Sequence, residues 1–183
     1  MMNTYHQERI WSPNQCEQAI EIANKNGFRP GVLSAANNVA EGVFPDVRKC
    51  MNSRVTYKTG PDLVQSVYDF VVGINQWGFE LLDEPPQLEI LAYKGEGHFM
   101  RHTDWGGMNS RRKISISIQL SDPEDYEGCD LLLYDGPFGE VEASKEKGVA
   151  IAFPSWTLHE VTPLTSGERV VAVAWFLGPQ SYR

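Results

Sequence analysis

Two residues separated by a single position, His102 and Asp104, supply an imidazole and a carboxylate at a spacing that suits metal binding. Side chains on a β-strand alternate between its two faces, so residues i and i+2 lie on the same face. A second imidazole follows at His159. Two histidines and one carboxylate form the facial triad, which binds Fe(II) on one side and leaves positions open for chemistry. The sequence therefore predicts that His159 comes from a strand folded back beside the first.

Arg169 begins an otherwise apolar run, 169–177, that is typical of a buried strand. A buried guanidinium needs an anionic partner, because an unpaired buried charge is costly. A salt bridge to a nearby carboxylate is the simplest such partner. The His-x-Asp spacing alone is a weak signal, because two-residue motifs arise by chance and such residues are commonly only solvated.

Four segments surround these residues in a fixed order: Tyr93-Lys94-Gly95-Glu96-Gly97-His98-Phe99 before His102, Leu120-Ser121-Asp122-Pro123-Glu124-Asp125-Tyr126-Glu127-Gly128, Phe153-Pro154-Ser155 before His159, and Ser166-Gly167-Glu168-Arg169. Together they resemble the core of the Fe(II)/2-oxoglutarate-dependent dioxygenases, and within them the prolyl 4-hydroxylase-like branch that contains the PKHD-type hydroxylases. The resemblance covers residues 87–177 well and the N-terminal half loosely. One departure is Cys129, which stands where relatives usually have a second glycine.

This resemblance implies a co-substrate site beside the metal. The triad would hold Fe(II), 2-oxoglutarate would take two further positions, and O₂ the last. Arg169 would bind the far carboxylate of 2-oxoglutarate with its planar fork of donors. Tyr93 matches a tyrosine that relatives place against the co-substrate, and Gln119 is expected to hydrogen-bond it. Turnover would give succinate, carbon dioxide and a hydroxylated C–H bond, since halogenating relatives lack the carboxylate of Asp104. Ascorbate is a further candidate cofactor.

Composition favours one enzyme-sized domain, 1–183, with no membrane or nucleic-acid partner. The 183 residues are 42% hydrophobic, enough for one well-buried core. A formal net charge of −8 argues against binding a phosphate backbone, with the basic cluster 111–113 as the one exception. The chain has no eighteen-residue apolar run and no secretory signal, and its three cysteines are scattered. We therefore expect a cytoplasmic protein.

The pattern of apolar residues predicts a mainly β fold with N-terminal helices. Helical support is expected over 1–86, with a helix from a capping box at Ser12 to about Gly27 and another over about 61–76. The segment 34–54 shows no period and is either a lid or a surface excursion. Eight strands are expected in the core 87–177: 87–94, 98–104, 113–121, 129–135, 139–143, 148–153, 158–163 and 169–177. They suggest a jelly roll, or double-stranded β-helix, in which the second, seventh and eighth strands are neighbours.

Strict alternation marks the third of these strands. Its isoleucines must face an apolar layer, whereas Ser115, Ser117 and Gln119 face the other way. That polar row points either to solvent or into a cavity beside Arg169, and the resemblance favours the cavity. If Arg169 points inward, then Val171, Val173 and Trp175 do so too. His98 lies too far from His102 to share its metal, and His6 is expected in an N-terminal tail.

The substrate is the least determined part of the prediction. A prolyl residue of a peptide or protein is slightly favoured over a free amino acid or another small molecule. The Gly-rich segment 105–112 is either a gate or a plain hairpin loop. Two other classes stay open: a metal- or sugar-binding jelly roll without turnover, and a cupin-like isomerase that uses the same metal set.

Overall fold

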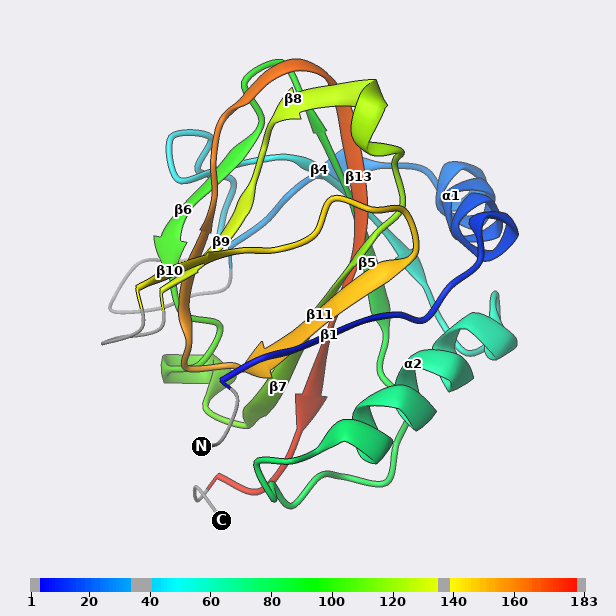
Figure 1. Cartoon of the computed structure of the whole chain (residues 1–183), viewed down its shortest axis with the longest axis vertical. Helices are drawn as coiled ribbons and strands as arrows, with labels where there is room; N and C mark the ends of the chain where they lie inside the picture. Colours follow the sequence, from blue (N-terminus) through cyan, green and yellow to red (C-terminus); the bar gives the residue numbers. More distant parts are fainter. Residues whose placement is uncertain (1–3, 34–40, 135–138, 181–183) are drawn as a thin grey trace.

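The computed structural model describes residues 4–33, 41–134 and 139–180. In these ranges the chain forms two antiparallel β-sheets, and two helices lie together on one side of the larger sheet (Figure 1). Within the described residues, no helix is both long and apolar enough to cross a membrane.

The larger sheet has a seven-strand path, with an eighth strand paired to one of its members. The path runs β1 (His6–Arg9), β11 (Val149–Pro154), β7 (Arg112–Gln119), β13 (Leu164–Leu177), β5 (Leu88–Lys94), β4 (Met51–Val55) and β2 (Arg29–Pro30). The short β8 (Tyr126–Gly128) pairs with the beginning of β13. The smaller sheet runs β10 (Glu140–Glu142), β9 (Leu131–Tyr134), β12 (Leu158–Val161), β6 (His98–His102) and β3 (Arg48–Lys49). Two single 3₁₀ turns, η1 (Gly107–Asn109) and η2 (Pro123–Asp125), join strands.

Both predicted helices form where expected. Helix α1 (Pro13–Asn26) begins with the predicted capping box, in which Ser12 and Gln15 satisfy each other's backbone N–H groups. Helix α2 (Pro61–Ile74) begins at a proline whose missing N–H costs nothing in the first turn. Their apolar faces bury residues such as Ala19 and Leu63 against the larger sheet. Truncating a fully buried leucine typically lowers the free energy of unfolding by about 2–5 kcal/mol, so packing of the two helices contributes to the stability of the larger sheet.

The N-terminal part is not purely helical, and this part of the prediction was wrong. It adds four short strands, β1 to β4, to the edges of both sheets. His6, expected in a tail, lies in β1 opposite Ala152. The segment 34–54 contains β3 and most of β4, while its first residues, 34–40, lie outside the described residues. The polar residues of β4 gave no strand pattern in the sequence. Ser53, for example, is buried, and its hydroxyl donates a hydrogen bond to the carbonyl of Ala23 at 2.8 Å.

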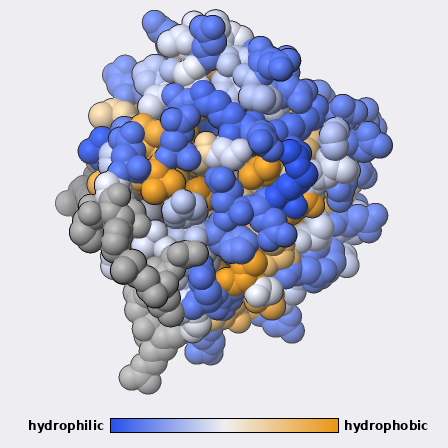
Figure 2. Space-filling model, viewed as in Figure 1, coloured by the Kyte–Doolittle hydropathy of each residue, from blue (hydrophilic) through white to orange (hydrophobic). Residues whose placement is uncertain are grey.

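Strand β7 separates the two cores of the molecule. Its isoleucines pack into the cluster that α1 and α2 cover, as the alternation predicted. Its serines face the second cluster, which lies between the sheets and contains Leu91, Leu131 and Phe153. The outside seen in Figure 2 is mostly hydrophilic with separate hydrophobic patches, as expected once the largest apolar side chains are inside.

The expected strands are present in order, but the neighbour relation predicted for the last of them was wrong. Strand β12 pairs with β6, whereas β13 pairs with β5, β7 and β8 in the larger sheet. Strand β13 also begins earlier than predicted, at Leu164. Arg169 therefore lies in the sheet opposite the one that carries the two histidines.

Candidate active site

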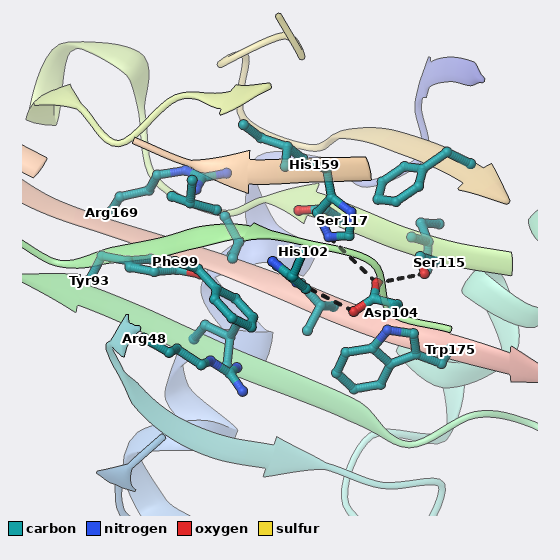
Figure 3. A pocket seen from close by; sticks show the side chains of 17 residues that line it. Arg48, Tyr93, Phe99, His102, Asp104, Ser115, Ser117, His159, Arg169 and Trp175 are labelled. Carbon is teal, nitrogen blue, oxygen red and sulfur yellow. Dashed lines mark hydrogen bonds and ion pairs between the residues drawn. The ribbon is translucent and has the colours of Figure 1, made fainter. Parts of the chain in front are cut away.

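A cavity lies between the sheets, and side chains of both line it (Figure 3). Its polar lining residues are Arg48, Tyr93, His102, Asp104, Ser115, Ser117, His159 and Arg169. Apolar side chains, among them Leu91, Phe153 and Val171, separate these groups. The cavity thus has an apolar wall with a few convergent polar groups, the usual composition of a small-molecule site.

His102, Asp104 and His159 converge at one end of this cavity. One potential ligand atom from each lies within 4.8 Å of the others. The two histidines face each other across the β6–β12 pair, and Asp104 follows two residues after the end of β6. Each histidine Nε2 lies 3.6 Å from a carboxylate oxygen of Asp104. The structure therefore brings together the three residues that the sequence singled out.

The two imidazoles are held in the orientation that metal binding requires. His102 Nδ1 lies 2.7 Å from the carbonyl of Met100, and His159 Nδ1 lies 2.9 Å from the carbonyl of Thr157. A carbonyl only accepts hydrogen bonds, so each Nδ1 carries the proton and each Nε2 keeps its lone pair. Two Nε2 lone pairs and one carboxylate fit a divalent transition metal.

Asp104 is a buried carboxylate held in its charged form. Burial alone would raise its pKa, but the positive charge available on His159, His102 and Arg112 outweighs burial and lowers the pKa. The hydroxyl of Ser115 donates to Asp104 Oδ2 at 2.7 Å. Burial also lowers the pKa of His159, which favours the neutral imidazole. A charged Asp104 and a neutral His159 are the protonation states that metal ligands need.

Arg169 lies at the other end of the cavity and is 1% exposed. Its Nε donates to Gln119 Oε1 at 3.1 Å, and its guanidinium carbon lies 5.6 Å from the ring centre of Tyr93. Among the described residues no carboxylate lies within salt-bridge distance, so the simplest partner considered from the sequence is not found there. A buried cation without an anion is a candidate site for an anionic ligand.

Tyr93 and Gln119 support Arg169 in different ways. Tyr93 lies opposite Arg169 in the β5–β13 register and lines the cavity. Burial raises the pKa of Tyr93, so its hydroxyl stays protonated and able to donate. Gln119 lies behind Arg169, where its amide nitrogen also donates to the carbonyl of Ser144 at 3.3 Å. In this structure Gln119 therefore contacts Arg169, which in turn faces the cavity.

The departure at Cys129 lies directly beside Arg169. Gly128 and Cys129 both have positive φ, +69° and +54°, which explains why glycine suits this turn. A Cβ at Gly128 would come within 2.4 Å of the carbonyl oxygen of Pro163, so only that position excludes a side chain. Cys129 Sγ instead packs 3.9 Å from Arg169 Nη1. Burial raises the pKa of this thiol, which therefore adds no negative charge beside Arg169.

Among the residues of the cavity wall that sequence reasoning missed are Arg48 and Phe99. The pairing of β6 with β12 shifts register between His159 and Val161, so Phe99 and His102, three residues apart, both face inward. Phe99 consequently stacks on His102 with ring centres 3.6 Å apart. Arg48 comes from β3, in a segment without periodicity, so no sequence pattern indicated it. His98 only begins β6, where it contacts the carbonyls of Glu96 and Asp46.

The sequence is similar to a known protein family and to several of its members. Residues 88–177, which span β5 to β13, match the 2OG-Fe(II) oxygenase superfamily. A PKHD-type hydroxylase of Maricaulis maris is 29% identical over 93% of this chain and 75% of its own length. A PKHD-type hydroxylase of Picosynechococcus sp. is 38% identical over 53% of this chain, which spans 46% of that protein.

Two solved structures share the fold over nearly the whole chain. A prolyl-4-hydroxylase of Pseudomonas putida has a TM-score of 0.76, with 96% of this chain and 93% of its own covered. A prolyl hydroxylase of Trichoplax adhaerens, in complex with a hypoxia inducible factor peptide fragment, has a TM-score of 0.75 over 96% and 84%. Each is 16% identical to this chain, so they show the fold alone. Through residues 88–177, which hold the candidate site, the chain matches the 2OG-Fe(II) oxygenase superfamily.

Proposed function

We propose that this protein is an Fe(II)- and 2-oxoglutarate-dependent hydroxylase that acts on a prolyl residue. The observation that carries the proposal is one cavity with two complementary ends. Three metal-ligand side chains converge within 4.8 Å at one end, and a buried arginine without a carboxylate partner among the described residues lies at the other. A dicarboxylate that chelates the metal and reaches the arginine satisfies both ends.

The residues present fit the proposed metal. His102 and His159 would each give Nε2, and Asp104 would give a carboxylate oxygen, because their other polar atoms already contact the protein. Fe(II) held there would supply the oxidative decarboxylation of 2-oxoglutarate by O₂ that drives hydroxylation. Ser115, whose hydroxyl also lies 2.9 Å from that of Ser155, would keep Asp104 oriented toward the metal.

The chain's own residues would bind and orient the co-substrate. Gln119 already engages Nε of Arg169, which leaves terminal guanidinium donors for a carboxylate. The Tyr93 hydroxyl is protonated and reaches the same part of the cavity (Figure 3). The apolar wall between the two ends would exclude water, which strengthens each charged contact.

A prolyl substrate is supported by the relatives rather than by a contact in this structure. The solved structures with this fold include the prolyl hydroxylase of Trichoplax adhaerens bound to a peptide fragment. Trp175 lines the cavity with a flat aromatic ring, and the Arg112 guanidinium stacks over that ring at 3.8 Å. A rigid aromatic ring of this kind suits the compact, apolar pyrrolidine ring of proline.

The test is formation of succinate from 2-oxoglutarate by the purified protein with Fe(II) and ascorbate. We expect slow turnover without substrate, and its loss in His102→Ala. A panel of proline-containing peptides, followed by mass spectrometry, should then show one member that gains one oxygen. Iron-loaded protein that forms no succinate would contradict the proposal and favour a metal-binding jelly roll without turnover.

A further inference from the structure

Arg48 is a buried cation whose neighbours among the described residues are one carbonyl oxygen, one carboxylate in a long ion pair and one thiol. It is 7% exposed, and Nη1 donates to the carbonyl of Val32 at 3.3 Å. Its Nε has no hydrogen-bond partner by geometry among the described residues, and Nη2 forms a long ion pair with Glu89 Oε2 at 4.0 Å, beyond hydrogen-bond distance. The same Glu89 oxygen accepts from Asn52 at 2.9 Å. A buried guanidinium in this state calls for a further partner.

The position of Arg48 shows where that partner would lie. Strand β3 pairs with β6, which places Arg48 opposite Phe99, with its guanidinium carbon 4.9 Å from the Phe99 ring centre. Phe99 in turn stacks on the metal-ligand candidate His102. Arg48 therefore lines the same cavity as the triad, on the wall contributed by Phe99 (Figure 3).

The proposed function does not use the charge of Arg48. When Fe(II) and 2-oxoglutarate are bound, the two positive charges of the metal and the one of Arg169 balance Asp104 and the two carboxylates of the co-substrate. Arg48 is then the one charged side chain of the described lining without a counter-charge inside the cavity. A carbonyl oxygen would accept one hydrogen bond, but an anion in the cavity would also compensate the charge at closer range than Glu89 does at 4.0 Å.

We propose that Arg48 binds a carboxylate of the organic substrate. This inference rests on the proposed function and narrows it: the hydroxylated residue carries its own free carboxyl group, either as a free amino acid or at the C-terminus of a peptide. The planar guanidinium suits a carboxylate better than a point charge does. A substrate proline would lie between Arg48 and the metal, beside the ring of Phe99.

Matched ligands test the inference directly. The protein with Fe(II) and 2-oxoglutarate, kept anaerobic, is titrated by calorimetry with L-proline and with a proline-terminated peptide, each as free acid and as amide. We expect at least one acid to bind about 10- to 100-fold more tightly than its amide, as a charge-assisted hydrogen bond allows. Which acid binds distinguishes the free amino acid from the peptide terminus. Equal binding of acid and amide in both pairs would overturn the inference.

Two substitutions check that Arg48 is the cause. Arg48→Gln should reduce the acid-to-amide ratio to about one, whereas Arg48→Lys should keep part of it. Glu89→Gln should act in the opposite direction and tighten acid binding several-fold, because it removes the charge that competes for Arg48. Loss of acid preference in Glu89→Gln would contradict the proposal even where Arg48→Gln fails to fold.

The control is Arg54→Gln, which removes an exposed arginine of β4 and should leave the ratio unchanged. Mass gain of one oxygen in the preferred acid, measured after air is admitted, links binding to turnover. If succinate forms but the free acids bind no more tightly than the amides, only the proposed role of Arg48 is contradicted. Absence of succinate from the iron-loaded protein would instead remove the proposed function.

Discussion

The two ends of the cavity hold opposite charges with very different surroundings. At the triad end, Asp104 has two imidazoles, the Arg112 guanidinium at 3.8 Å and a serine hydroxyl around it. At the other end, Arg169 contacts a glutamine amide, a thiol and a tyrosine ring, all of them neutral. One buried charge is compensated by the protein, and the other is compensated by nothing in the described part of the chain.

This difference assigns different ligands to the two ends. The triad end offers lone pairs and a carboxylate, so it attracts a cation even though the protein already stabilises its charge. The arginine end offers only donors, so its charge is fully compensated when an anion arrives. A ligand with one chelating end and one carboxylate end can bind in a single orientation. Substitutions at the two ends should therefore fail in distinguishable ways.

The largest effect is expected at the triad. Asp104→Ala removes the only carboxylate among the three candidate ligands, and we expect succinate formation to fall about a thousandfold or more, together with Fe(II) binding. Iron content and succinate are measured on the same sample. Asp125→Ala, which removes an exposed carboxylate, is the control. Full iron content and turnover in Asp104→Ala would show that the triad is not the metal site.

Arg169→Ala should fail differently. We expect the KM for 2-oxoglutarate to rise about 100-fold while Fe(II) binding is kept, because the lost contact is with the far carboxylate. Arg169→Lys keeps the charge without the fork and should be intermediate. Steady-state kinetics and iron content measure the two properties separately. An unchanged KM for 2-oxoglutarate in Arg169→Ala would contradict the assignment of this end of the cavity to the far carboxylate.

Sequence reasoning reached the triad and Arg169 for physical reasons that do not depend on the whole fold. The i, i+2 spacing predicted His102 and Asp104 on one face of a strand, and they do lie together, although β6 ends at His102 and Asp104 lies two residues beyond it. A cation at the start of an apolar run needs only burial. The positions of Arg48 and Phe99 in the cavity could not be predicted from local patterns. Arg48 lies on a two-residue strand with no apolar pattern, and Phe99 faces the cavity only because β6 carries an irregularity opposite His159. Edge strands and bulges are set by tertiary pairing, which a one-dimensional pattern does not contain.

A smaller effect separates the support of the triad from the triad itself. Ser115→Ala removes the hydrogen bond to Asp104 Oδ2, and we expect Fe(II) affinity to fall about 10-fold. Ser117, the next inward serine of β7, also lines the cavity and has no side-chain hydrogen bond among the described residues. Ser117→Ala is therefore the matched control. Equal losses in the two variants would point to a general effect of truncating β7.

The smallest effect concerns the pH dependence of stability in metal-free protein. The folded-state pKa of Asp104 is lowered, so the unfolded chain binds a proton that the folded chain does not as pH falls below the ordinary carboxyl value of about 3.9. Asp104 thus stabilises the fold above that pH, and its contribution is lost below it with a slope of up to about 1.4 kcal/mol per pH unit.

Asp104→Asn should make this acid dependence less steep, whereas Arg169→Gln should leave it unchanged because a guanidinium does not titrate in acid. Urea unfolding between about pH 3 and pH 5 measures the slope for both variants and for the parent protein. Because no metal is present, the result reports how the protein itself compensates the two charges. Identical slopes in the parent and Asp104→Asn would mean that the surrounding imidazoles and Arg112 do not hold this carboxylate charged, and the contrast between the two ends of the cavity would then lose its electrostatic basis.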